Sequence, residues 1–184
     1  MNQPIDTMNL KREIAAWDGR SGSDIRNMYD RYSHTSSFVS DLLRFTKEDS
    51  LQKGATWLLK QHFEKMECLE PSEVKAFCLL IPHLKGWETK LHVLQCIPYM
   101  SIPKTQKKKV ETFLRKCLVD DAKFVRAWAY NGFYELAVQY PQYQGETKGL
   151  FEVAMRNEAA SVKARIRNIM KKDFYSGFIS AQDS

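Results

Sequence analysis

Four basic residues recur along the sequence at intervals of 36 or 37 residues, and each is followed by a small or apolar residue. An interval of this length accommodates two helices and their turns, so the four side chains would occupy equivalent positions in successive helix pairs. Basic side chains form charged hydrogen bonds with carboxylates and phosphates. They are therefore the first candidates for a binding surface: Lys53, Lys90, Arg126 and Lys163.

Three further candidates lie in the last third of the chain. Lys163, Arg167 and Lys171 fall at i, i+4 and i+8, which places them on one flank of a helix. Such a row could bind an acidic partner or follow a phosphate backbone, but the polar outer surface of a terminal repeat explains it equally well. The aromatic residues between 124 and 140 are expected mostly in the core, with Tyr130 and Tyr134 expected to reach a groove.

Residues that could support catalysis or bind a metal do not form a recognised arrangement. His92 and Cys96 are one helical turn apart, but no further His or Cys follows at the spacing of a zinc site. The segment 19–23 lacks the spacing of a nucleophile elbow or a phosphate-binding loop and is expected to be a flexible turn. The sequence therefore predicts no catalytic residue, no metal and no cofactor, and it favours a protein that is not an enzyme.

A dense basic run, residues 104–109, offers a second possible site for phosphates. The alternative is the solvated first turn of a helix whose apolar stripe includes Val110, Phe113 and Leu114. We favour the second interpretation, because charged runs on protein surfaces are common.

The elements that would position these residues are all helices. Apolar residues at i, i+1, i+4 and i+5 form a wide helical stripe that recurs four times, beginning at Phe38, Phe77, Phe113 and Leu150. This series interleaves with the basic series at nearly the same period, which is typical of stacked helix pairs. We expect an all-α solenoid of about four helix pairs. One structural domain would contain an N-terminal helical cap over residues 1–35, repeats over 36–175 and a frayed tail over 176–184.

Composition limits the remaining possibilities. The chain has 184 residues, is 43% hydrophobic and carries a net charge of +6, which permits an anionic partner without requiring one. No run of about 18 apolar residues is present, so no membrane association is expected. The four cysteines are scattered among apolar neighbours, as reduced core residues of a cytoplasmic protein would be.

The third helix pair resembles HEAT and armadillo-like repeat proteins. Its second helix follows an acidic turn and then reads Val-Arg-Ala, at Asp120, Asp121 and 125–127. The resemblance extends over roughly residues 36–172 and implies a curved stack with the second helices on its inner face. It implies no reaction, because HEAT-like scaffolds mostly bind proteins and sometimes nucleic acids.

One enzymatic branch of that fold is the alkylpurine DNA glycosylases, which are similar in size and charge and use tryptophans, an aspartate and basic residues on the inner face. This chain offers three tryptophans, and Arg126 and Lys163, at comparable places. It lacks an aspartate on the same face, since Asp120 and Asp121 lie in a turn, so no catalytic residue is transferred. The three tryptophans within the region of the resemblance are Trp57, Trp87 and Trp128.

The sequence thus leads to two hypotheses. The favoured one is a non-enzymatic scaffold that binds a protein or peptide on the concave face of the repeat stack. The alternative is a nucleic-acid-binding protein, possibly a base-processing relative, with a basic concave face. For Arg126 a structural role competes with both, because its guanidinium could pair with the acidic turn at Asp120 or Asp121.

Overall fold

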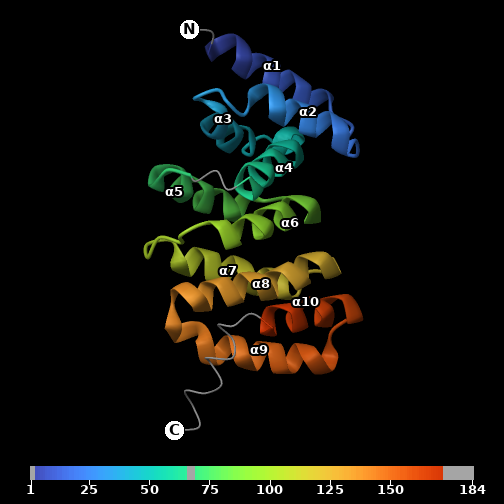
Figure 1. The fold of residues 1–184 in the computed structure, drawn as a ribbon, viewed down its shortest axis with the longest axis vertical. Coiled ribbons are helices and arrows are strands. Elements are labelled where there is room, and N and C mark those ends of the chain that lie inside the picture. Colours follow the sequence, from blue (N-terminus) through green and yellow to red (C-terminus); the bar gives the residue numbers. More distant parts are fainter. Residues whose placement is uncertain (1–2, 66–68, 172–184) are drawn as a thin grey trace. The chain divides into compact units, whose positions relative to one another are not determined.

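The computed structural model describes residues 3–65 and 69–171, and every α-helix and short 3-10 turn in these ranges follows the expected all-α pattern (Figure 1). No strand occurs among the described residues. The chain divides into two compact units between Met100 and Ser101. This division falls inside the segment expected to form one continuous repeat array. The expected tail, 176–184, lies outside the described residues.

The first unit contains six α-helices and two 3-10 turns. In chain order they are α1 (Gln3–Ala16), α2 (Gly22–Tyr32), α3 (Phe38–Phe45), α4 (Asp49–Glu64), α5 (Pro71–Leu80), η1 (Ile81–His83), α6 (Trp87–Cys96) and η2 (Ile97–Tyr99).

Local chemistry explains several of these helix ends. The hydroxyl oxygen of Ser21 accepts a hydrogen bond from the Asp24 amide at 3.3 Å and caps α2. The helix α5 starts at a proline, whose missing N–H is not needed in a first turn. Pro82 and Pro98 follow the last residues of α5 and α6 and lie in 3-10 turns, because proline cannot continue an α-helix.

Helix α4 is the centre of the first unit. It packs against α6, the second helix of the next pair, and against α1, α2 and α3. The α1 contact is unusually close at Gly54, where an added Cβ would lie 2.8 Å from Cγ2 of Ile14. A larger residue at this position would therefore require Ile14 to move. The cap expected over residues 1–35 stays a prediction.

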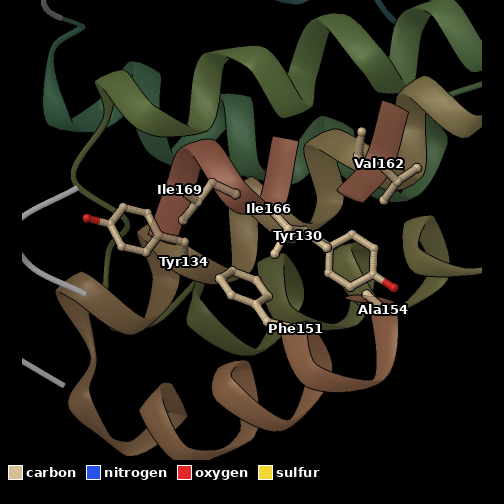
Figure 2. Packing of buried hydrophobic residues seen from close by; sticks show 8 residues of the cluster. Tyr130, Tyr134, Phe151, Ala154, Val162, Ile166 and Ile169 are labelled. Carbon is tan, nitrogen blue, oxygen red and sulfur yellow. The ribbon is translucent and has the colours of Figure 1, made fainter. Parts of the chain in front are cut away.

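In the second unit, the described residues 101–171 form four α-helices. They are α7 (Lys107–Leu118), α8 (Lys123–Gln139), α9 (Gln144–Asn157) and α10 (Ala160–Met170), with the 3-10 turn η3 (Pro141–Tyr143) before α9. Helix α8 packs against the other three. Figure 2 shows part of the hydrophobic core of this unit. In it the rings of Tyr130 and Phe151 meet edge to face, with centroids 6.2 Å apart.

Two further observations concern the described residues as a whole. None of their helices is both long and apolar enough to cross a membrane. Three of the cysteines, Cys78, Cys96 and Cys117, are buried and form no disulfide, and Cys68 lies outside the described residues.

Candidate binding surface

The Lys53 side chain, on α4, forms an ion pair and an aromatic contact within the first unit. Its ammonium nitrogen lies 2.9 Å from Oε1 of Glu88, in the first turn of α6, and 6.0 Å from the centroid of the Trp17 ring. The ion pair joins residues 35 positions apart, on α4 and α6, and it lowers the pKa of Glu88. Lys90, the equivalent residue of the next repeat, is half-buried on α6. Lys53 therefore links two helices as well as facing solvent.

A second link between α4 and α6 involves a buried histidine. Nδ1 of His92 lies 3.1 Å from the Thr56 hydroxyl oxygen, 36 residues away. Burial lowers the pKa of His92 to about 4, assisted by the nearby Lys60 and Lys53 charges and opposed by Glu88. The imidazole is therefore neutral at pH 7 and acts as a packed polar group.

His92 and Cys96, which the sequence suggested as a possible pair of metal ligands, also form a buried contact. The Cys96 thiol donates to the carbonyl oxygen of His92 at 3.2 Å, and burial raises the pKa of that thiol. A thiolate is the form that binds metals, so this environment opposes metal binding. No cluster of three or more His, Cys, Asp or Glu suited to a metal ion occurs in the described part of the chain.

Arg126, in the first turn of α8, holds two interhelical turns together. Its Nε and Nη2 donate to the Glu158 carboxylate at 2.9 to 3.2 Å. Its Nη1 donates to the carbonyl oxygens of Asp120 at 2.8 Å and Asp121 at 3.1 Å. The side chains of Arg126 and Glu158 are only 21% and 13% exposed. The guanidinium thus connects the turn before α8 with the turn before α10, and little of it remains for a partner.

Tyr130 lies inside the second unit, because its residue surface is only 7% exposed. Burial raises the pKa of its hydroxyl to about 12, with a further contribution from Glu158. Figure 2 shows the ring between Phe151, Ala154 and Val162. The groove contact expected from the sequence is therefore not available to most of this side chain, and Tyr134 is buried as well.

The basic row of α10 is placed on the surface. Arg167 and Lys171 are exposed, whereas Lys163 is half-buried and its ammonium nitrogen donates to the carbonyl oxygen of Arg156 at 3.0 Å. No ion pair with a carboxylate involves these three residues among the described atoms. The row therefore contributes positive charge without contributing to internal ion pairing.

The basic run before α7 is partly used within the unit. Lys108 and Arg115 both pair with the buried carboxylate of Glu111, which also accepts a hydrogen bond from Tyr143 at 2.9 Å. Burial alone would raise the pKa of Glu111, but these three donors lower it. Lys107 lies 5.1 Å from the centroid of the Tyr140 ring. These contacts support the interpretation of the run as a helix start.

The sequence did not predict the closest cation–aromatic contact among the described residues. The Arg165 guanidinium carbon, on α10, lies 4.0 Å from the centroid of the Trp128 ring, on α8. The two residues are 37 positions apart, which equals the repeat interval predicted from the sequence. The repeat interval could have identified them, because second helices of neighbouring pairs pack side by side.

Charge is distributed unevenly between the two units. Residues 1–100 contain 13 basic and 13 acidic side chains, whereas residues 101–171 contain 14 basic and 7 acidic ones. Residues 101–171 therefore carry a net charge of +7, and the whole second unit, 101–184, carries +6. No Asp or Glu occurs from Ala159 to Lys171. A positive surface of this kind favours encounters with anionic partners.

Comparisons of the chain with protein-family models, with curated proteins and with solved structures find no significant match.

Proposed function

We propose that this chain is a short HEAT-like helix-pair scaffold that binds an acidic protein or peptide segment through its second helices. The repeat interpretation is supported by the packing within each unit, where α4 lies against α6 and α8 lies against α10. Contacts between these neighbours recur near the repeat interval, as in Thr56 with His92 and Trp128 with Arg165. Stacking of this kind produces an extended concave surface on which partners bind.

The chemistry of the partner follows from the charge of the second unit. Residues 101–171 have a net charge of +7, against zero for residues 1–100, and this is the single observation that carries the proposal of an acidic partner. Electrostatic attraction of this kind raises association rates and excludes basic competitors. The reduced, buried cysteines are consistent with a cytoplasmic location, which belongs to the same proposal.

A folded protein or peptide is favoured over nucleic acid by the composition of the α8 surface. Phe124 is 52% exposed and Trp128 follows one turn later, so this stripe is largely apolar. Glu135 continues the same face two turns beyond Trp128, and its carboxylate would repel a phosphate backbone that followed the helix. A short acidic segment with apolar neighbours fits this pattern better.

The test uses the full chain as bait for a displayed library of random 16-residue peptides. Enriched peptides are synthesised, labelled and titrated by fluorescence anisotropy at 50 and 150 mM NaCl. A DNA duplex and a single strand serve as comparators. We expect enriched peptides to be acidic with apolar neighbours and to bind at both salt concentrations, whereas DNA binds only at the lower one. Absence of any enriched peptide, or DNA binding tighter than peptide binding at 150 mM NaCl, would refute the proposal.

A further inference from the structure

The strongest unexplained feature of the surface is the pairing of Arg165 with Trp128. The Arg165 guanidinium carbon lies 4.0 Å from the centroid of the Trp128 ring. A contact with an aromatic ring does not use the N–H edge of a guanidinium, which stays available as a donor. That edge is the part of arginine that binds a carboxylate in a bidentate manner. The indole therefore acts as a platform that restricts the arginine side chain.

Apart from the Trp128 ring, the Arg165 guanidinium has no partner among the described residues. No hydrogen bond or ion pair to its guanidinium is formed by any described residue, in contrast to Arg115 and Arg126, which are each paired with carboxylates. Desolvation lowers the pKa of Arg165, and no neighbouring carboxylate offsets that effect. A partly desolvated cation without a counter-ion destabilises a fold, so a role outside the fold is indicated.

Phe124, close in sequence to Trp128, offers an apolar surface to a ligand bound at Arg165. Phe124 precedes Trp128 by one turn of α8, and its ring is more than half exposed. The ammonium nitrogen of Lys123 lies 5.5 Å from the centroid of that ring. An exposed apolar residue with a neighbouring cation, one turn from Trp128, is suited to a ligand that combines an anionic group with an apolar side chain.

We propose that Arg165, Trp128 and Phe124 form a docking site for a short linear peptide in which an Asp or Glu lies next to an apolar residue. The carboxylate accepts two hydrogen bonds from the Arg165 guanidinium, and the apolar side chain covers Phe124. Trp128 positions the arginine and contributes part of the apolar contact. This inference rests on the proposed function and names its site and ligand class.

The site is distinguished from general electrostatic attraction by a matched pair of substitutions. Arg165→Gln and Arg167→Gln each remove one positive charge from α10, but residues two positions apart face different sides of a helix. The probe is the most strongly enriched acidic peptide from the displayed library, titrated by fluorescence anisotropy at 150 mM NaCl. A third variant, Arg165→Lys, retains the charge while removing the planar, bidentate donor.

We expect Arg165→Gln to weaken peptide binding at least tenfold, Arg165→Lys about fivefold, and Arg167→Gln less than twofold. Phe124→Ser should weaken binding severalfold, with a smaller effect on peptides whose apolar residue is replaced by serine. Circular dichroism at 222 nm and thermal unfolding verify that each variant is folded. Arg165→Gln should unfold at the same temperature as the original chain or slightly above it, because an unpaired, desolvated charge is removed.

Two outcomes would overturn the inference, and they are separable from failure of the proposed function. Equal losses for Arg165→Gln and Arg167→Gln would show that only net charge matters. Tight binding of peptides without any acidic residue would exclude the ligand class. If the original chain selects no peptide at all, the proposed function fails and the docking site fails with it.

Discussion

The contact between Arg126 and Glu158 offers the sharpest test of how the second unit is held together. Replacing Arg126 with methionine retains much of the aliphatic volume and removes the guanidinium. The substitution eliminates three hydrogen bonds to the Glu158 carboxylate and two to backbone carbonyls of the turn before α8. It leaves a largely buried carboxylate that keeps the Ala159 amide at 3.2 Å and the Tyr130 hydroxyl as hydrogen-bond partners.

The magnitude follows from the exposure of the pair. A charged hydrogen bond contributes roughly 1.5–3 kcal/mol, and removal of one partner of a fully buried ion pair costs about 3–5 kcal/mol. Because the two side chains are 21% and 13% exposed, water can partly solvate the remaining carboxylate. We therefore expect Arg126→Met to lower the free energy of unfolding by about 2–3 kcal/mol.

The assay is urea denaturation followed by circular dichroism at 222 nm, at pH 7 and 150 mM NaCl. A double-mutant cycle with Glu158→Gln isolates the interaction. The double variant should be less destabilised than the sum of the single variants by about 1–2 kcal/mol, because it leaves no unpaired charge. Glu152→Gln, an exposed carboxylate on α9, is the control and should have little effect.

A change below about 0.5 kcal/mol for Arg126→Met, or strict additivity in the cycle, would refute this assignment. Arg126 would then be available for a partner, as the sequence hypothesis allowed. Peptide binding by the folded fraction of Arg126→Met provides the complementary measurement. We expect its affinity to stay within about threefold of the original value, since the guanidinium is occupied by internal acceptors.

Three further predictions concern packing and pH. Gly54→Ala should lower the free energy of unfolding by about 1–3 kcal/mol in urea denaturation, because the new methyl would lie 2.8 Å from Cγ2 of Ile14; no loss would show that α1 shifts freely. His92 has a pKa of about 4 in the folded chain, against about 6.5 when unfolded, so the unfolded chain binds more protons between these values. The contribution of His92 to the free energy of unfolding should be fully present above pH 6.5 and should fall by up to about 3 kcal/mol as the pH drops to 4. His92→Gln should flatten this pH dependence. The control His34→Gln, at an exposed residue, should leave it unchanged. Gln106→Met should leave thermal stability unchanged or raise it by up to about 1 kcal/mol, because the buried Oε1 of Gln106 has no hydrogen-bond partner; a clear loss would indicate a bound water there.

The helical content of the chain could be predicted from the sequence because apolar spacing is a local property. Stripes beginning at Phe38, Phe77 and Phe113 begin within α3, α5 and α7 in the structure. Prolines at 82 and 98 end helices for steric reasons that need no tertiary information. The helices therefore occur where the periodicity indicated, whereas their stacking across the whole chain stays a prediction.

The candidate site was less accessible to sequence reasoning. A basic residue that recurs at a fixed interval looks the same whether it faces a partner or a carboxylate. Lys53 and Arg126 share a repeat position, yet Arg126 is surrounded by acceptors and Lys53 keeps part of its side chain in solvent. Burial of Tyr130 likewise depends on how closely α9 and α10 approach α8, which periodicity does not specify.

The sequence alone thus determined the element type, the helix boundaries near prolines and the excess of positive charge after residue 100. Tertiary structure decided which of those charges are neutralised internally and which remain without a partner. The physical reason is distance. An ion pair or a stacked arginine depends on ångström-scale separation between side chains on different helices, and that separation is set by packing. Arg165 became a candidate only when α10 placed it 4.0 Å above Trp128.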